Sequence, residues 1–325
     1  MKAIIRKGDG GPEVLQLGEV FPPQPTDTQL LVDVKATALN RLDLIQRRGG
    51  YPPPPGESDI LGLEIAGTVS GFGKAPAGFN EGDRVFGLIG GGGYAEKAVI
   101  DYRMAMLIPD GWSFEEAAAV PEVFFTANEN VFTLGCLSAD ESILIHAGGS
   151  GVGTAGIQIA NHAGASVFVT AGTTEKIQGC KALGAIAGIN YKNLDFVDEI
   201  GRLTDGEGVD VVLDFIGSSY LASNLQILKT KGRLLQVGLM GGSTAEIDLG
   251  TLMRKRLHII GSVMRSQSLD EKIAITQRFS ERWMPALKAG TIHPVIDKVF
   301  SLSQVREAHA YMEANRNFGK IILTV

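Results

Sequence analysis

The feature that most constrains the fold is a glycine-rich turn between an apolar run and a helical pattern. Residues 143–153 read ILIHAGGSGVG, and they lie in a segment of 33 residues, 142–174, without Asp, Glu, Lys or Arg. Glycine lets a backbone approach a pyrophosphate closely, and the helix that follows offers free N–H groups and a positive dipole end. The sequence therefore predicts a strand, a tight turn and a helix that together bind a dinucleotide.

The turn departs from the G-x-G-x-x-G spacing at one position, where Ser150 stands between Gly148 and Gly153. Serine is also small, and its hydroxyl group can serve as a donor, so we keep Ser150 among the cofactor-binding candidates. A close-packed turn without a ligand is the alternative. The charge-free segment is long enough to cross a bilayer, but its glycines and polar side chains favour a buried strand–helix–strand unit, and we expect no membrane partner.

Strand and helix patterns alternate through the second part of the chain. We expect strands at residues 142–146, 166–170, 187–191, 209–216, 232–237 and 257–261, with helices at 151–163 and 174–183 among them. This alternation predicts an α/β fold with a doubly wound parallel sheet. The first 120 residues instead have short β patterns, at 30–34, 62–69, 83–88 and 94–100, while helical patterns return at 269–289 and 303–315 before a last strand at 320–325.

Length and composition narrow the function classes. A chain of 325 residues predicts about two domains. The formal net charge of −6 disfavours a nucleic-acid partner. Cys136 and Cys180 are the two cysteines, too few for a disulfide framework or a four-cysteine zinc site, which favours a reducing compartment, the cytoplasm.

The end of the second expected strand indicates which dinucleotide binds. Sites that prefer NAD place Asp or Glu there, to bind the ribose 2′-hydroxyl group. Here Gly172 stands at the tip, followed by Thr173 and Lys176, which suits a 2′-phosphate and favours NADPH. In the alternative, Glu175 binds the ribose and Lys176 is a solvated helix residue.

Motifs spread along the whole chain resemble those of one superfamily. They are residues 38–40, 62–67, 82–85, 118–121, 146–153, 190–191, 238–242 and 319–321. With them the chain resembles the medium-chain dehydrogenases/reductases, in the zinc-free quinone oxidoreductase branch. Four stretches, residues 51–56, 121–126, 238–242 and 311–315, resemble most the tumour-suppressor-inducible subgroup of that branch. The resemblance implies a GroES-like β-barrel catalytic domain, residues 1–122 and 268–325, and a Rossmann NADPH-binding domain, residues 123–267, with six strands. It also implies an active site in the cleft and a homodimer through the last Rossmann strand, near residues 257–263.

The resemblance also bears on metal binding. Zinc-dependent relatives have a cysteine and a Gly-His-Glu motif where this chain has Asn40 and Leu63. Neither side chain supplies a thiolate or an imidazole, so we expect no metal. An acceptor that takes up a hydride by its own electronics, a quinone or an enone, is then favoured over an alcohol bound to a metal.

Site residues follow from the matched motifs. By resemblance, Gly151, Val152 and Gly153 lie under the pyrophosphate; Gly172, Thr173, Lys176 and Tyr191 surround the 2′-phosphate; Thr126, Phe215, Ile216, Gly238, Leu239 and Met240 line the ribose and nicotinamide; Met264, Arg265 and Asn317 close the cleft; and Asn40 and Tyr51 face the nicotinamide and the substrate.

These expectations add up to an NADPH-dependent quinone reductase. Tyr51 would donate a hydrogen bond to a quinone carbonyl, and Asn40 would orient the carbonyl or the nicotinamide amide. The alternatives are a loop tyrosine packed against prolines and an asparagine with a structural role in a turn. His146 is expected to be a core histidine, and no general acid stands out. At the level of function, an enone or alkenal reductase and a low-activity, crystallin-like NADPH-binding protein remain as alternatives.

Overall fold

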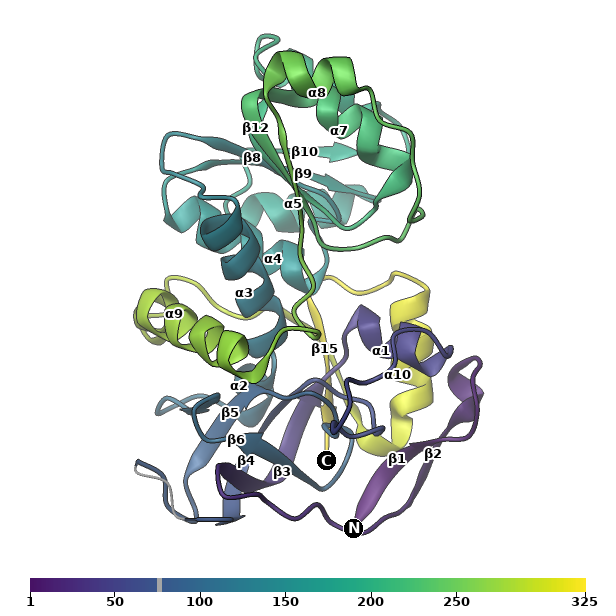
Figure 1. Cartoon of the computed structure of the whole chain (residues 1–325), viewed down its shortest axis with the longest axis vertical. Coiled ribbons are helices and arrows are strands. Elements are labelled where there is room, and N and C mark those ends of the chain that lie inside the picture. Colours follow the sequence, from purple (N-terminus) through teal and green to yellow (C-terminus); the bar gives the residue numbers. More distant parts are fainter. Residues whose placement is uncertain (75–77) are drawn as a thin grey trace. The chain divides into compact units, whose positions relative to one another are not determined.

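The computed structural model describes residues 1–74 and 78–325, and it divides the chain into two compact units (Figure 1). Unit 1 contains Met1–Phe125, Arg265–Lys288 and Pro294–Val325, and unit 2 contains Thr126–Met264 and Ala289–His293. The main boundaries lie three residues from the expected ones, and the return of residues 289–293 to unit 2 has no counterpart in the expectation. Within the described residues, no helix is both long and apolar enough to cross a membrane.

Unit 2 is built on one parallel sheet of six strands. They are β8 (Ser142–Ile145), β9 (Ser166–Ala171), β10 (Ala187–Asn190), β11 (Val209–Asp214), β12 (Leu228–Gln236) and β13 (His258–Gly261). Their order is β10-β9-β8-β11-β12-β13, so the strand sequence reverses beside β8. In such sheets ligands bind outside the carboxyl ends of the strands at the reversal point. The predicted doubly wound parallel sheet is confirmed.

Helices connect these strands, and local capping explains where several of them begin. They are α4 (Gly151–His162), α5 (Thr174–Ala182), α6 (Phe196–Leu203), α7 (Leu221–Ile227) and α8 (Leu249–Lys255). Helix α4 packs on β8 and β9, and α7 and α8 pack on β12 (Figure 1). Hydroxyl side chains of Ser150 and Thr173 accept hydrogen bonds from the first turns of α4 and α5. Gly184, with a φ of +112°, follows the end of α5, as the sequence predicts.

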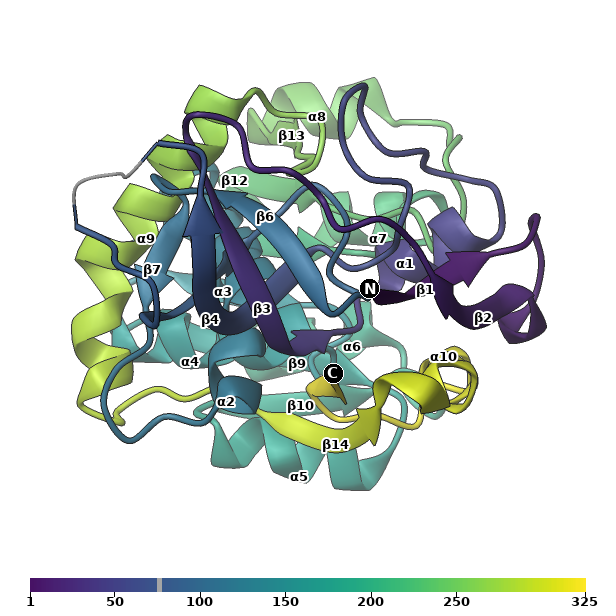
Figure 2. The same cartoon turned by 90° about the horizontal axis from the view of Figure 1, so that it is seen from below.

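Unit 1 contains a strand pair and a seven-stranded sheet. The pair is β1 (Lys2–Arg6) with β2 (Leu15–Glu19), and the sheet contains β3 (Gln29–Ala38), β4 (Glu64–Phe72), β5 (Arg84–Leu88), β6 (Lys97–Asp101), β7 (Ala105–Leu107), β14 (Ile296–Ser301) and β15 (Lys320–Thr324). Strand β3 pairs with β4, β6 and β15, and Figure 2 shows β3, β4 and β6 side by side. The C-terminal strand β15 therefore joins a sheet made mainly by the N-terminal part of the chain.

Five further helices contribute to this unit. They are α1 (Arg41–Arg47), α2 (Phe114–Ala118), the first residues of α3 (Pro121–Asn128), α9 (Leu269–Lys288) and α10 (Val305–Glu313). Phe279 of α9 is fully buried, with its ring 4.6 Å from that of Phe125. A second core holds β1, α10 and β15 together through residues such as Ile4, Met312 and Ile321. Two long-range segments of the chain are thus fixed by apolar burial.

The structure corrects some expected boundaries. Strand β12 begins at Leu228 and not at residue 232: Leu228 pairs with Val209 of β11, and the register then shifts before Arg233 pairs with Val211. The strand expected at 94–100 begins at Lys97, since the Tyr94 backbone bonds to Leu61 and Ile4 outside the main sheet. The pair β1–β2 has no counterpart among the strands expected from the sequence.

Candidate active site

The predicted site residues fall into two groups. Unit 2 contains those expected around the pyrophosphate, the adenosine and most of the nicotinamide path, together with Thr126 and Met264. Unit 1 contains Asn40, Tyr51, Arg265 and Asn317. The unit 2 group consists mainly of backbone groups and small residues, whereas the unit 1 group consists mainly of polar side chains.

The turn between β8 and α4 has the geometry that the sequence predicts. Ser150 is the N-cap of α4 and accepts a hydrogen bond of 3.0 Å from the Gly153 N–H. The N–H groups of Gly151 and Val152 stand in the first turn, where no acceptor within the helix exists. A Cβ atom on Gly153 would lie 2.6 Å from the carbonyl oxygens of Ala147 and Gly148, so glycine is required for this close approach.

The residues expected around a 2′-phosphate lie at the ends of β9 and β10. A Cβ atom on Gly172 would come within 2.7 Å of the Tyr191 hydroxyl oxygen, which shows that the tyrosine lies against the glycine. Tyr191 is nearly half exposed, at 46%. Thr173 caps α5 and Lys176 stands in the first turn of that helix. The structure therefore brings these four residues together at one corner of the sheet.

Most of the remaining unit 2 candidates lie on two loops, one after β11 and one after β12, which are connected by backbone hydrogen bonds. The Met240 N–H donates to the Phe215 carbonyl at 3.1 Å, and the Gly241 N–H donates to the Ile216 carbonyl at 2.6 Å. Leu239 and Met240 expose more than half of their surfaces. Asp214 is a residue that the sequence analysis missed: it is fully buried, and its carboxylate accepts the N–H groups of Ile216 and Gly217 at 2.8 and 2.9 Å. It thus fixes the course of the first loop.

Thr126 provides a test of whether unit 2 fits a nicotinamide dinucleotide. Its residue is 5% exposed, and its hydroxyl oxygen has no hydrogen-bond partner among the described residues. Buried polar groups are nearly always paired, so this hydroxyl group suits a polar group of a bound ligand. Together with the Gly153 cradle, it is compatible with the cofactor that the sequence predicts. Met264, also expected near the cofactor, is buried.

In unit 1, Asn40 belongs to a set of buried polar residues that the sequence did not place together. We call Asn40, Asp43, Glu64, Glu122 and Lys320 the buried polar cluster; each is at most 8% exposed. The Lys320 ammonium group donates to Glu64 Oε1 and Asn40 Oδ1, both at 2.7 Å, and to the Leu39 carbonyl at 3.0 Å. The Asn40 amide nitrogen donates to the same Glu64 oxygen at 2.8 Å.

Both polar atoms of the Asn40 side chain are therefore occupied within the protein. The backbone N–H of Asn40 donates to Asp43 Oδ2 at 2.8 Å, which starts α1. This geometry favours the structural alternative for Asn40, since its side-chain amide already bonds to Glu64 and Lys320. A direct role in orientation is not supported by these contacts.

Two carboxyl groups of the buried polar cluster have shifted acidities. Burial raises the pKa of Asp43 to about 6, although hydrogen bonds from Asn40 and Tyr94 oppose the shift. Burial, and next the charge of Glu64, raise the pKa of Glu122 to about 7. Perturbed carboxyl groups of this kind concentrate at functional sites.

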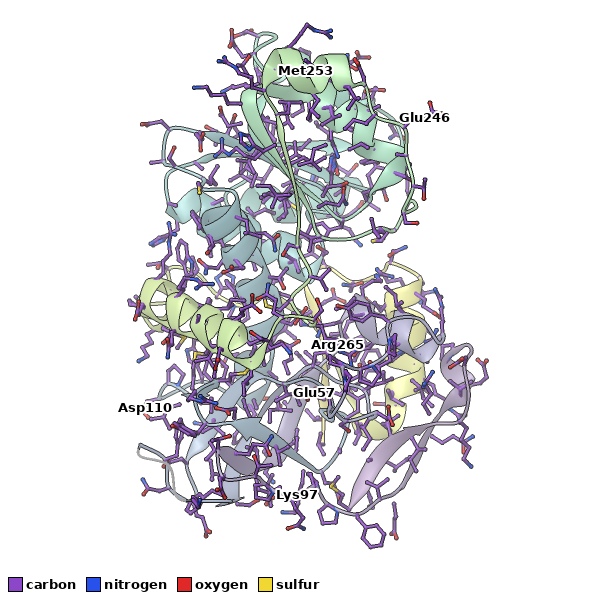
Figure 3. The ribbon with its side chains drawn as sticks, viewed as in Figure 1. Glu57, Lys97, Asp110, Glu246, Met253 and Arg265 are labelled. Atoms are coloured by element: carbon purple, nitrogen blue, oxygen red, sulfur yellow. The ribbon has the colours of Figure 1, made fainter. Side chains whose placement is uncertain are left out.

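Tyr51 and Arg265 lie together in unit 1. The guanidinium carbon of Arg265 is 5.4 Å from the centre of the Tyr51 ring, and one of its nitrogens donates to the Tyr51 carbonyl at 3.2 Å. Arg265, labelled in Figure 3, also donates hydrogen bonds to the Gln46 side chain and the Gly90 carbonyl. Its Nε has no partner among the described residues. Tyr51 has a φ of +55°, a backbone strain that these contacts help to hold. Asn317 is buried and donates to the Gly319 carbonyl.

The sequence analysis also missed Glu64, Glu122 and Lys320 as site residues. Each is a single charged residue in an otherwise apolar stretch, and this pattern could have indicated a buried charge. His146 is confirmed as a core histidine: it is fully buried, and its ring nitrogens contact Thr170 and Asn224 at 3.0 and 2.8 Å. Burial lowers its pKa.

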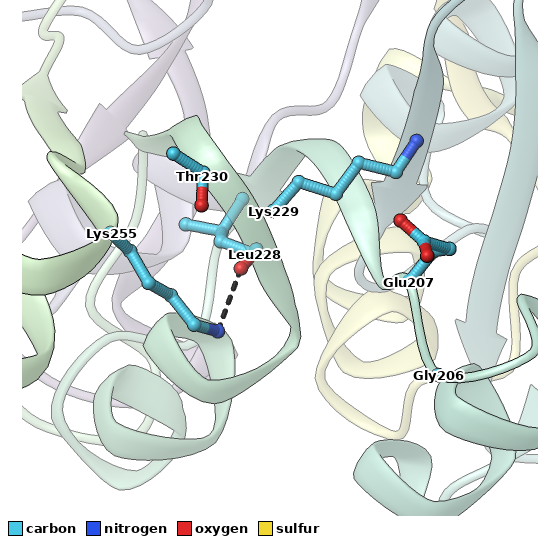
Figure 4. Close-up of a pocket in the computed structure, with 6 residues that line it drawn as sticks. All are labelled: Gly206, Glu207, Leu228, Lys229, Thr230 and Lys255. Atoms are coloured by element: carbon cyan, nitrogen blue, oxygen red, sulfur yellow. Dashed lines mark hydrogen bonds between the residues drawn. The ribbon is translucent and has the colours of Figure 1, made fainter.

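A surface cavity of unit 2, of about 370 Å³, lies among Gly206, Glu207, Leu228, Lys229, Thr230 and Lys255 (Figure 4). The Lys255 ammonium group donates to three backbone carbonyls, including that of Leu228 at 2.8 Å, and Lys229 is paired with Asp210. These cations are therefore engaged by the protein itself, and none of the predicted site residues lines the cavity. In the described part of the chain, no group of three or more His, Cys, Asp or Glu could hold a metal ion.

Comparison with known proteins agrees with this arrangement. Residues 26–110 match the alcohol dehydrogenase GroES-like domain family, and residues 151–281 match the zinc-binding dehydrogenase family. Human quinone oxidoreductase is 32% identical over 99% of this chain and 97% of its own length. The predicted GroES-like and Rossmann organisation is thereby confirmed.

Solved structures show the same similarity over the full chain. The Escherichia coli quinone oxidoreductase complexed with NADPH is 29% identical with a TM-score of 0.91, and the alignment covers 100% of both chains. The CurK enoyl reductase is 27% identical with a TM-score of 0.88, over 99% of this chain and 98% of its own. On this evidence the chain belongs to the medium-chain dehydrogenase/reductase superfamily, as an oxidoreductase related to the quinone oxidoreductases.

Proposed function

We propose that this protein is an NADPH-dependent quinone reductase, which transfers a hydride from nicotinamide C4 to ortho- or para-quinones without a metal. The observation that carries the proposal is the Lys320 ammonium group, bonded at 2.7 Å to both Asn40 and Glu64. A fixed positive charge beside these two side chains opposes a metal cation there. An acceptor that takes up a hydride without a Lewis acid is therefore favoured.

The cofactor proposal rests on the unit 2 contacts. A bound nicotinamide dinucleotide supplies the hydride, and the protein orients it. Gly151, Val152 and Gly153, with Ser150 as cap, would hold the pyrophosphate at the start of α4. Gly172, Thr173, Lys176 and Tyr191 would hold the 2′-phosphate, and Thr126, Phe215, Ile216, Gly238, Leu239, Met240 and Met264 would line the rest of the path. For Arg265 and Asn317, which belong to unit 1, the cofactor role is proposed from the resemblance alone. The preference for NADPH depends on Lys176 in the first turn of α5.

In unit 1, Tyr51 is the proposed donor to the acceptor carbonyl. Negative charge develops on that oxygen as the hydride arrives, and a fixed hydroxyl donor stabilises it. The Arg265 guanidinium group above the Tyr51 ring holds the tyrosine and adds positive charge. Asn40 is the proposed support of the Lys320–Glu64 pair.

The test is the decrease of reduced-nicotinamide absorbance with an ortho-quinone, a para-quinone and an enone, each with NADPH and with NADH. We expect rapid NADPH oxidation with at least one quinone and slow oxidation with NADH. Enzyme-free mixtures control for direct reduction of the quinone. Absence of quinone turnover by folded, NADPH-binding protein would rule the proposal out.

One alternative activity has a specific observation in its favour, the similarity to the CurK enoyl reductase. The same cofactor geometry can deliver a hydride to the β-carbon of an α,β-unsaturated carbonyl. A higher kcat/KM with the enone than with either quinone would assign this reaction. Tight NADPH binding without turnover of any acceptor would instead assign a low-activity binding protein.

We also propose a homodimer through β13. This strand pairs with β12, and Ile259 and Val263 beside it are 41% and 48% exposed. Unpaired strand edges of this kind favour pairing with a second chain. Light scattering after size exclusion should give twice the chain mass, and Ile259→Lys should lower that mass toward the monomer. The two thiols, both free, suit the proposed reducing, cytoplasmic location.

A further inference from the structure

The proposed reduction of a quinone needs a proton, and no residue has yet been assigned to supply it. A hydride transferred to a quinone gives an anion, and a proton must follow to complete the hydroquinone. The sequence shows no obvious general acid for this step. The buried polar cluster of unit 1 contains a carboxyl group that the proposed reaction does not otherwise use, on Glu122 at the start of α3.

Glu64 is the member of this cluster whose negative charge is compensated. Its Oε1 accepts hydrogen bonds from Lys320 and Asn40, at 2.7 and 2.8 Å. Its Oε2 accepts the backbone N–H of Glu122 at 2.8 Å. Three donors, one of them the buried ammonium group of Lys320, thus satisfy one carboxylate.

Glu122 lies beside this ion pair, and among residues 1–74 and 78–325 its carboxyl group has no comparable set of donors. Its side chain is 8% exposed, and its own backbone N–H is directed to Glu64. A buried carboxyl group beside an ion pair that is already neutral gains little compensation for a charge of its own, so it keeps its proton. Because Glu64 has the cation, Glu122 is the group that keeps the proton.

The electrostatic surroundings of Glu122 agree with this assignment. Burial and the negative charges of Glu64 and Asp43 raise its pKa, whereas Lys320 and Arg265 lower it, and the result is about 7. The amino end of α3 also favours the carboxylate, but burial dominates. A group with this acidity exchanges a proton readily at neutral pH.

Glu122 also acts electrostatically on Tyr51, the proposed donor to the acceptor carbonyl. Burial, followed by the charge of Glu122, raises the pKa of Tyr51, while Arg265 lowers it. Tyr51 thus lies within the electrostatic field of Glu122 and under the Arg265 guanidinium group, 5.4 Å from the ring centre. Both residues belong to unit 1.

We propose that Glu122 is the proton reservoir of the reductase and acts through Tyr51. The inference rests on the proposed function. After the hydride has reached the acceptor, the Tyr51 O–H bond breaks and its proton passes to the acceptor oxygen. The Glu122 O–H bond breaks in turn, and its proton restores the Tyr51 hydroxyl group through intervening water. Solvent then reprotonates Glu122, so that one hydride and one proton convert the quinone to hydroquinone.

The first test is infrared spectroscopy of the unliganded protein, because it does not depend on turnover. We expect a protonated carboxyl band that titrates with a midpoint near pH 7 and is missing in Glu122→Gln, whereas the band of Asp43, with a midpoint near pH 6, remains in that variant. Glu115→Gln, which removes a less buried glutamate seven positions earlier, should keep the band. A wild-type protein without such a band between about pH 5 and 9 would overturn the inference, since Glu122 would then hold no proton.

The second test is the pH profile of kcat with saturating NADPH and quinone. Wild-type kcat should fall above about pH 7, because the reservoir is then empty. Glu122→Gln should lower kcat at pH 6 by about tenfold to hundredfold and abolish this fall, with the KM for NADPH within about twofold of wild type. Glu122→Asp should restore part of kcat together with a displaced fall.

The outcomes separate the two proposals. A Glu122→Gln protein that keeps the wild-type pH profile would show a merely structural role and refute the reservoir. If the wild-type protein reduces neither quinones nor enones, the proposed function and the delivery step fail together. The infrared titration then still decides whether Glu122 stores a proton. Should Glu122→Gln not fold, the aspartate variant and the wild-type titration supply the same decision.

Discussion

The dinucleotide-binding part of unit 2 and the buried polar cluster of unit 1 are built in opposite ways. The first consists of N–H groups, small residues and close backbone approaches such as that at Gly153. The second consists of polar and charged side chains, brought together from the start of α1, β4, α3 and β15. A backbone site depends on local geometry and tolerates changes of charge. A side-chain cluster depends on mutual compensation, so removal of one member affects all the others.

The largest effect is expected where this compensation is broken. Lys320→Ala should lower the free energy of unfolding by about 3–5 kcal/mol, because Glu64 would be left as an uncompensated buried charge. Urea denaturation measures the change. Lys35→Ala, which removes an exposed lysine of β3, should change it by less than about 0.5 kcal/mol. The double variant Lys320→Met/Glu64→Gln should recover much of the loss; a loss equal to that of Lys320→Ala would contradict the charge explanation.

A second test of unit 1 uses pH. Burial, and next the Arg47 charge, lower the pKa of His309 from 6.5 to about 3. A depressed pKa means that the unfolded chain binds the proton more tightly, so this stabilisation is present above pH 6.5 and is lost as the pH falls toward 3. From pH 7 to pH 3 the unfolding free energy should fall by about 2–4 kcal/mol more in wild type than in His309→Gln. An equal fall of the unfolding free energy in wild type and His309→Gln would show that the lowered pKa of His309 is not the cause.

In unit 2, we expect one added methyl group at Gly153 to weaken NADPH binding. Gly153→Ala places a Cβ atom 2.6 Å from two carbonyl oxygens, and the turn under the pyrophosphate must move. We expect NADPH to bind about thirtyfold more weakly, or about 2 kcal/mol, by calorimetry. Gly201→Ala is the matched control, since nothing lies within 4 Å of its Cβ position in α6. Equal affinities of the two variants would show that the turn does not hold the cofactor.

The smallest expected effect concerns the one proposed charged contact of unit 2. Lys176→Ala should raise the KM for NADPH about tenfold, because a partly exposed lysine contributes roughly 1–2 kcal/mol to a phosphate contact. The KM for NADH should stay within about twofold, since NADH has no 2′-phosphate. Steady-state kinetics with both cofactors provides the comparison. An equal rise for NADH would remove the 2′-phosphate assignment.

The sequence predicted the parts of the site that are local. The strand, the turn and the helix at residues 142–163 appear in the structure with boundaries within one residue. Gly172 and Tyr191 are 19 positions apart, but they follow neighbouring parallel strands, so their contact could also be expected. Gly153 is required by short contacts to Ala147 and Gly148, its near neighbours along the chain, which is why this glycine is visible in the sequence.

The role of Asn40 shows where such prediction stops. From the sequence, an amide at this position was compatible with orientation of a substrate. The structure directs both of its polar atoms to Glu64 and Lys320, which are 24 and 280 positions away along the chain. No periodicity or spacing encodes a contact between residues so far apart.

The sequence by itself thus determined the fold class, the dinucleotide-binding turn and the residues at the ends of the parallel strands, because hydrophobic periodicity and glycine geometry act over a few residues. Only the tertiary structure decided which charges are buried together. Pairing of β15 with β3 brings Lys320 to Glu64, and α3 brings Glu122 to the same carboxylate. The acidity of Glu122 follows from that packing, since burial and neighbouring charge, and not residue type, set the pKa of a buried carboxyl group.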